Sequence, residues 1–195
     1  MIQTTTPETV SVIAYETANP APLGLCSLGM TLLLFSLHTA GFFGLNAMVI
    51  AMGIFYGGLA QIIAGIIQGR RNNTFGLTAF TSYGFFWLSV AAILILPELG
   101  WAKAASNEAM TAFFAVWALF SFLLFIATLR LGVALQFTFA LLTLFFILLA
   151  FADFTLKSNI RQFAGYTGLI CGLASIYTGI ADLLNDVYRK IILRV

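Results

Sequence analysis

The sequence TANPAPLGLCSLGMTLLLFSLHTAGFFGLNAMVIAMGIFYGGLAQIIAGIIQG spans residues 17–69 and contains no Asp, Glu, Lys or Arg. A helix needs about 20 apolar residues to cross the hydrocarbon core of a bilayer. This run is long enough for two crossings, and residues 40–46 (AGFFGLN) place turn-forming residues in its middle. It therefore predicts a helical hairpin within a membrane.

Four further charge-free runs follow, at residues 72–97, 109–129, 131–152 and 162–181, each long enough for one crossing. They are continuously apolar and lack the alternation of a membrane β-barrel. The sequence thus predicts an all-α integral membrane protein, a bundle of six transmembrane helices at residues 23–41, 47–69, 75–96, 110–129, 132–152 and 162–184. We divide the chain into a mobile N-terminal tail (1–18), the six-helix transmembrane domain (19–188) and a short basic C-terminal tail (189–195).

The overall composition excludes several classes of protein. Of the 195 residues, 61% are hydrophobic and 8% charged, and the net charge is +2. A soluble domain carries about 25% charged residues, and a nucleic-acid binder needs a basic patch. One histidine and two cysteines are too few for a metal site. We expect no enzyme, no metal and no cofactor.

The loop charges predict the orientation. Six spans put both termini on one side of the membrane. That side would carry six basic residues and the other side three, the sets being Arg70, Arg71, Arg130, Arg189, Lys190 and Arg194 against Lys103, Lys157 and Arg161. Because basic loops stay in the cytoplasm, we expect both termini to be cytoplasmic in the plasma membrane.

Small residues recur along the second and sixth predicted helices. In the second helix they fall every four residues around one polar side chain, at Gly53, Gly57, Gln61, Gly65 and Gly69. The sixth has a similar set, at Gly165, Gly168, Gly172, Ser175 and Gly179. Such stripes allow close helix packing in lipid. They could also leave room for a narrow solute path. The helix at 132–152, crowded with phenylalanines, is expected to face lipid or a neighbouring subunit.

Polar groups within the spans are the candidate solute contacts. The first helix starts as Asn19-Pro20-Ala21-Pro22-Leu23-Gly24-Leu25, in which Asn caps the helix and the positive helix end can hold a carboxylate; an ordinary capped helix is the alternative. Hydroxyl groups follow in the third helix at Thr78, Thr81, Ser82 and Tyr83, where they either bond the preceding turn or line a polar path. Gln61 could add a donor.

The remaining titratable groups lie near predicted helix ends. His38 is close to the hairpin, and Asp153 and Asp182 lie where water is near. We interpret all three as interfacial. A proton relay through His38, or a gating role for the aspartates, is the alternative.

Four stretches of the sequence resemble one protein family. NPAPLGL (19–25), MGIFYGG (52–58), NTFGLTAFTSYG (73–84) and GLICG (168–172) are similar to the acetate uptake transporter family, also called succinate–acetate permeases. The resemblance extends over residues 18–187.

The resemblance implies a homohexamer with one solute path per six-helix subunit and a fold like that of the acid-activated urea channels. It implies transport of acetate and related short monocarboxylates, in some members succinate, as a proton symport or through a channel. A hydrophobic constriction would fall on Leu28, Tyr83 and Leu142. Many members have Phe where this chain has Leu28, so the constriction is expected to be wider or differently shaped. A passive channel for small neutral solutes, such as urea or undissociated acid, and an acetate sensor are the alternatives.

Overall fold

The computed structural model describes residues 17–194, and all regular secondary structure in that range is helical. The helices are α1 (Ala21–Thr39), α2 (Ala47–Ala51), η1 (Met52–Ala60), α3 (Gln61–Arg70), α4 (Thr74–Glu98), α5 (Asn107–Thr128), α6 (Val133–Thr155) and α7 (Ser158–Tyr188). The segments α2, η1 and α3 continue one another, so the described range holds six helices long and apolar enough to cross a membrane. The predicted all-α, six-span fold is confirmed, with α7 longer than expected at both ends.

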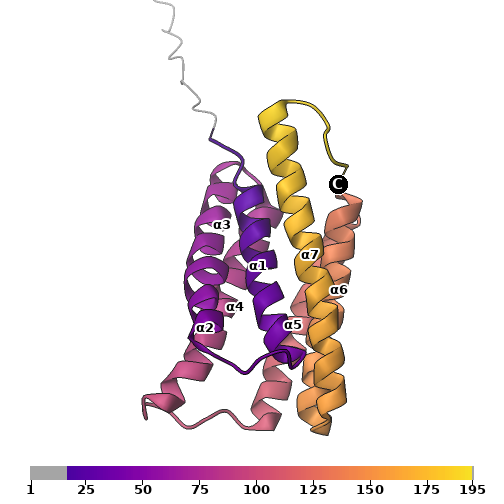
Figure 1. Cartoon of the computed structure of the whole chain (residues 1–195). Coiled ribbons are helices and arrows are strands. Elements are labelled where there is room, and N and C mark those ends of the chain that lie inside the picture. The colour runs from indigo at the N-terminus through magenta and orange to yellow at the C-terminus, as the bar shows by residue number, and fades with distance from the viewer. Residues whose placement is uncertain (1–16, 195) are drawn as a thin grey trace, which may run out of the picture.

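The helices run side by side, and both described chain ends lie at the same end of the bundle (Figure 1). The tail predicted at residues 1–18 falls almost entirely outside the described residues. The C-terminal segment folds back along α7. Asn185 Oδ1 accepts hydrogen bonds from the N–H groups of Ile192 and Leu193, and the Tyr177 hydroxyl donates to Arg194 O at 2.9 Å.

Polar side chains define where three helices begin. Asn46 Oδ1 accepts from Met48 N–H at 3.1 Å at the start of α2, and Asn73 Oδ1 accepts from Gly76 N–H at 3.0 Å at the start of α4. Ser106 caps α5 in the same way. Gly41 adopts a φ of +90° in the predicted hairpin turn, a conformation that favours glycine.

Glycines bring α1 and α7 into backbone contact. A Cβ atom on Gly29 would lie 2.6 Å from Gly172 O, and one on Gly172 would lie 2.8 Å from Gly29 O. One turn further along α7, the Ser175 hydroxyl donates to Leu25 O at 2.8 Å. The packing role predicted for the small residues of the sixth span is therefore confirmed.

The phenylalanines of α6 divide between two faces. Phe137 and Phe151 are exposed on the outside of the chain, whereas Phe139, Phe145 and Phe146 are buried in the main apolar cluster. The expectation that this helix turns its aromatic side chains outward was wrong for the three buried ones. Hydropathy does not separate the two faces, because lipid and a protein core are equally apolar.

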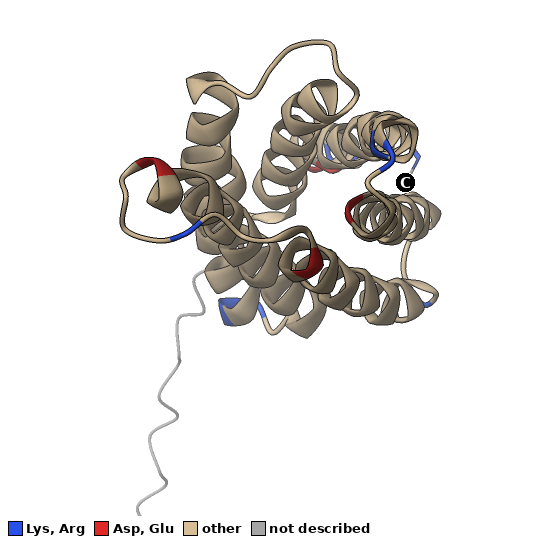
Figure 2. Ribbon diagram, turned by 90° about the horizontal axis from the view of Figure 1, so that it is seen from below, with Lys and Arg blue, Asp and Glu red and all other residues tan. Residues whose placement is uncertain are grey.

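The charged residues of the described range, coloured in Figure 2, lie in the connecting loops or within two turns of a helix end. One of them, Asp153, is only 4% exposed and forms an ion pair with Arg161. Asp153 is in the last turn of α6 and Arg161 in the first turn of α7, at the end of the bundle opposite the termini.

Candidate functional site

Three buried residues from different helices belong to the main apolar cluster of the bundle. Leu28 (α1), Tyr83 (α4) and Leu142 (α6) belong to one buried apolar cluster and are 2%, 1% and 1% exposed. Tyr83 also stacks on Phe146, with ring centroids 6.4 Å apart. All three residues expected at the constriction lie in this cluster. Their side chains are almost inaccessible to water, so this level of the bundle is closed.

The Tyr83 hydroxyl is turned toward α5. It lies 2.8 Å from Ser121 Oγ, which donates its own proton to Trp117 O at 2.7 Å. Tyr83 must therefore be the donor to Ser121. The hydroxyl was expected to offer its proton to a solute, but that proton is already bound within the protein. The contact of Ser121 with Tyr83 was not predicted, because a single serine in an apolar span forms no recognisable sequence pattern.

The other hydroxyl groups predicted to line a path in α4 do not gather around Tyr83. The Thr81 hydroxyl donates to Leu77 O at 2.5 Å, and its methyl group contacts Gly65 of α3. Two residues along a helix are about 200° apart, so Thr81 and Tyr83 lie on nearly opposite faces. Thr78 and Ser82 are half-buried. Of the two roles predicted for these hydroxyls, Thr81 has the first: it bonds the preceding turn of its own helix.

The first turn of α1 has fewer free donors than expected. Asn19 Oδ1 accepts from Ala21 N–H at 3.1 Å, and Pro20 O accepts from Gly24 N–H at 3.0 Å. Pro22 has no N–H. Within the described residues, Leu23 is left as the one N–H of this turn without a partner.

Gln61 is the most unusual polar side chain of the bundle. It is 0% exposed, yet neither its amide oxygen nor its amide nitrogen has a hydrogen-bond partner among residues 17–194. The same is true of the indole Nε1 of Trp87. An unsatisfied buried polar group costs about 1–3 kcal/mol. Each of these groups would need a solute or a water molecule to complete its hydrogen bonding.

Helix register places Gln61 at the height of Leu28 along the bundle. One turn before it, Gly57 approaches Thr31 and Trp87, and three residues after it, Ala64 packs with Leu25. These residues share one face of the second span. Since Leu28 lies between Leu25 and Thr31 on α1, the Gln61 amide is at the level of Leu28. Gln61 directly follows η1, and π-helical segments are frequent at functional sites.

A chain of aromatic contacts leads from the constriction toward one end of the bundle. Tyr83 contacts Phe146, whose ring centroid is 5.0 Å from that of Phe86; Phe86 contacts Trp87 at 5.3 Å, and Trp87 contacts Phe35 at 5.5 Å. Phe35 lines a cavity. The series of aromatic contacts that starts at Tyr83 therefore ends beside this cavity.

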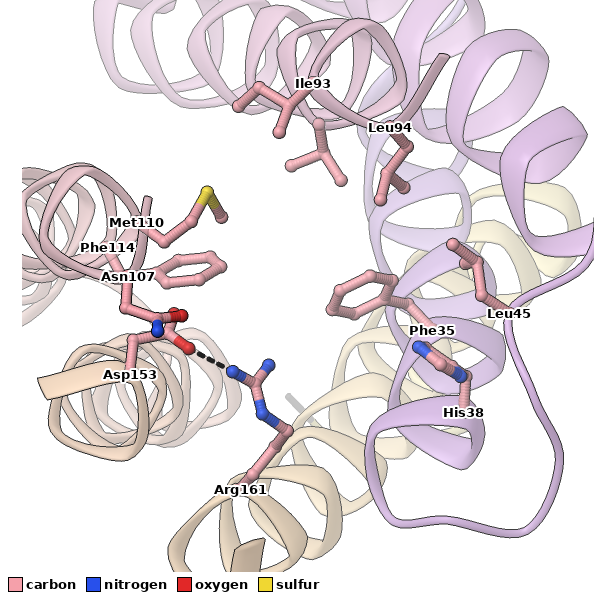
Figure 3. Close-up of a pocket in the computed structure, with 11 residues that line it drawn as sticks. Phe35, His38, Leu45, Ile93, Leu94, Asn107, Met110, Phe114, Asp153 and Arg161 are labelled. Atoms are coloured by element: carbon pink, nitrogen blue, oxygen red, sulfur yellow. Dashed lines mark hydrogen bonds and ion pairs between the residues drawn. The ribbon is translucent and has the colours of Figure 1, made fainter. Parts of the chain in front are cut away.

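That space, which we call the Arg161 cavity, has a volume of about 200 Å³ and opens at the end away from the termini. It is lined by apolar residues of α1, α4 and α5 and by four polar side chains, His38, Asn107, Asp153 and Arg161 (Figure 3). His38 Nδ1 is 3.1 Å from Phe43 O, which agrees with the interfacial interpretation of this histidine. The burial of Asp153 was not expected, because sequence spacing does not reveal its partner on the next helix.

Comparisons with known proteins agree with this architecture. The model of the GPR1/FUN34/yaaH family matches residues 1–195. The succinate-acetate/proton symporter SatP of Escherichia coli (strain K12) is 46% identical over 176 residues, which cover 90% of this chain and 94% of that protein. Ammonia transport outward protein 2 of Saccharomyces cerevisiae is 36% identical over 88% of this chain and 64% of its own length.

A solved structure, described as that of the bacterial acetate channel SatP, superimposes with a TM-score of 0.91. It is 45% identical and covers 92% of this chain and 99% of its own. The resemblance in the four sequence strings, the six-span fold and the match over the whole chain agree. The chain is a member of the GPR1/FUN34/yaaH family.

Proposed function

We propose that this protein is a permease for acetate and related short monocarboxylates, with succinate as a further candidate, and that each subunit has its own path. The observations that support the proposal are the burial of Leu28, Tyr83 and Leu142 in one apolar cluster and the buried, unpartnered amide of Gln61. The names of the bacterial relatives, a succinate-acetate/proton symporter and an acetate channel, support the same solute.

The methyl group of acetate suits the apolar residues of this region, and its carboxyl group suits the unpartnered polar groups. The methyl group can pass the apolar ring of Leu28 and Leu142. The carboxyl group loses water there, and an unpaired anion in an apolar medium is strongly disfavoured. The Gln61 amide and the Trp87 indole N–H supply donors that need no fixed charge. We propose that a proton travels with the substrate, since this lowers the same barrier.

The remaining expectations stand as parts of the proposal. The start of α1, from Asn19 to Leu25, and the hydroxyls of Thr78 and Ser82 are the further candidate path residues. The Thr81 hydroxyl, also expected in the path, bonds Leu77 O instead. We propose a homohexamer in the plasma membrane, with both termini in the cytoplasm and with lipid around its perimeter. The relatives are transporters and channels, and we propose that this chain transports its substrate without chemical change.

The test is uptake of radiolabelled acetate into proteoliposomes that contain the purified protein, at pH 5 and pH 7, with and without an imposed proton gradient. Empty vesicles give the background, because acetic acid crosses lipid unaided. The proposal expects protein-dependent uptake that the gradient accelerates. Absence of uptake, with acetate binding retained, would indicate a sensor. Uptake of urea at the same rate as acetate would indicate a channel for small neutral solutes.

A further inference from the structure

The polar side chains of the Arg161 cavity form an incomplete hydrogen-bond arrangement. Arg161 donates from Nη2 to Asp153 Oδ1. The second oxygen, Asp153 Oδ2, is buried and has no partner among residues 17–194. The Arg161 side chain is 48% exposed, and a guanidinium group has five N–H donors. Asp153 and Arg161 both line the cavity, with the Asn107 side chain beside the carboxylate (Figure 3). The ion pair thus leaves an acceptor on Asp153 and donors on Arg161 for a further partner.

This pairing matches an undissociated carboxylic acid better than its anion. An acid group R–COOH carries one O–H donor and one carbonyl acceptor on the same carbon, whereas R–COO⁻ carries acceptors alone. An anion placed at Asp153 Oδ2 would put two negative oxygens together. The ion pair has no net charge, so it does not attract anions from a distance.

We propose that the Arg161 cavity is the entry subsite of the permease and that it selects the undissociated acid. The acid O–H donates to Asp153 Oδ2, and the acid carbonyl accepts from Arg161. The alkyl group turns toward Phe35, Met110 and Phe114, which line the same cavity. The substrate enters with its proton in place and continues along the aromatic contacts to the constriction. This inference rests on the proposed function and specifies which form of the substrate is bound.

Other charged or titratable groups near Asp153 are few. His38 of α1 lines the same cavity, and Glu108 of α5 lines the adjoining cleft with Asp153. Lys157 is exposed in the turn between α6 and α7. His38 is the group whose own protonation could imitate the expected pH dependence, and it requires a control.

The first test needs only the wild-type protein. Proteoliposomes take up labelled acetate at trace concentration, and unlabelled acetate or acetamide competes at pH values from 5.5 to 7.5. Acetamide keeps a donor and an acceptor on one carbon at every pH. If the cavity selects the undissociated acid, the half-inhibiting concentration of total acetate rises about tenfold per pH unit, while that of acetamide stays constant. A constant value for acetate, or no competition by acetamide, overturns the inference.

Variants then assign the effect to the ion pair. Asp153→Asn leaves the Arg161 charge uncompensated and should accept the anion, so that the rise in half-inhibiting acetate with pH becomes flat. Arg161→Gln should retain the rise but weaken competition at every pH. His38→Gln should behave as wild type. A wild-type pH dependence in Asp153→Asn, or a flat one in His38→Gln, overturns the inference. Absence of any acetate uptake by the wild type would instead refute the proposed function itself.

Discussion

The Tyr83 hydroxyl donates a hydrogen bond to Ser121 Oγ at 2.8 Å and thereby ties α4 to α5 across the buried core. Ser121 in turn donates to the carbonyl of Trp117. The bond fixes the tyrosine ring in the apolar cluster that contains Leu28 and Leu142. At the proposed constriction, Tyr83 would therefore present the face and edge of its ring, while its hydroxyl serves as an anchor.

The anchor can be separated from the ring by two substitutions. Tyr83→Phe keeps the ring and should lower the free energy of unfolding by about 1 kcal/mol, with acetate uptake retained. Tyr83→Ala removes the ring, should cost about 3–5 kcal/mol, and should admit larger acids such as butyrate. Thermal unfolding in detergent and uptake of acids of increasing length give both readouts. Equal selectivity in Tyr83→Ala and wild type would refute the constriction.

A substitution at Leu28 can narrow the proposed constriction, whereas Tyr83→Ala would widen it. Leu28→Phe introduces the residue that many family members are expected to carry here, into a site where the leucine is 2% exposed. We expect slower uptake of propionate and butyrate relative to acetate, and a loss of about 1–3 kcal/mol from overpacking. Leu28→Met, of similar volume, is the control. A faster uptake of the longer acids by Leu28→Phe would contradict the assignment.

The sequence alone predicts the spans well because one energy term dominates them. A charged residue is costly at the bilayer centre, so charges mark the helix ends. The glycines of α7 were also interpretable, since close backbone approach needs small residues at regular spacing.

The contacts between helices were not predictable in the same way. Asp153 and Arg161 looked like separate interfacial charges, and their pairing depends on how α6 meets α7. The burial of Phe145 and the exposure of Phe151 follow from the rotation of α6, which apolar composition does not encode. Ser121 carried no motif, and its position at the Tyr83 hydroxyl emerges only from the packing of α4 against α5.

The contact of α1 with α7 predicts a large effect from a single methyl group. A Cβ on Gly29 would lie 2.6 Å from Gly172 O and 2.8 Å from the backbone nitrogen of Ile176. Because backbone atoms cannot move aside cheaply, Gly29→Ala should lower stability by about 1–3 kcal/mol. Gly44→Ala is the matched control, since a Cβ there meets nothing within 4 Å. Equal melting temperatures of the two variants would show that α1 and α7 are less closely packed.

Gln61 predicts opposite effects on stability and transport. Its buried amide lacks partners, so Gln61→Leu removes an unsatisfied group and should leave stability unchanged or raise it by about 1–3 kcal/mol. If the amide hydrogen-bonds the substrate carboxyl, the same variant should raise the half-saturating acetate concentration several-fold. Gln68→Leu provides a comparison: this amide is also buried, but its oxygen accepts from Asn73 Nδ2 at 2.9 Å, so its loss should destabilise the protein. Thermal unfolding in detergent and acetate uptake in proteoliposomes measure the two effects. A Gln61→Leu protein that is less stable and transports acetate normally would show that the amide has a structural partner and no part in the path.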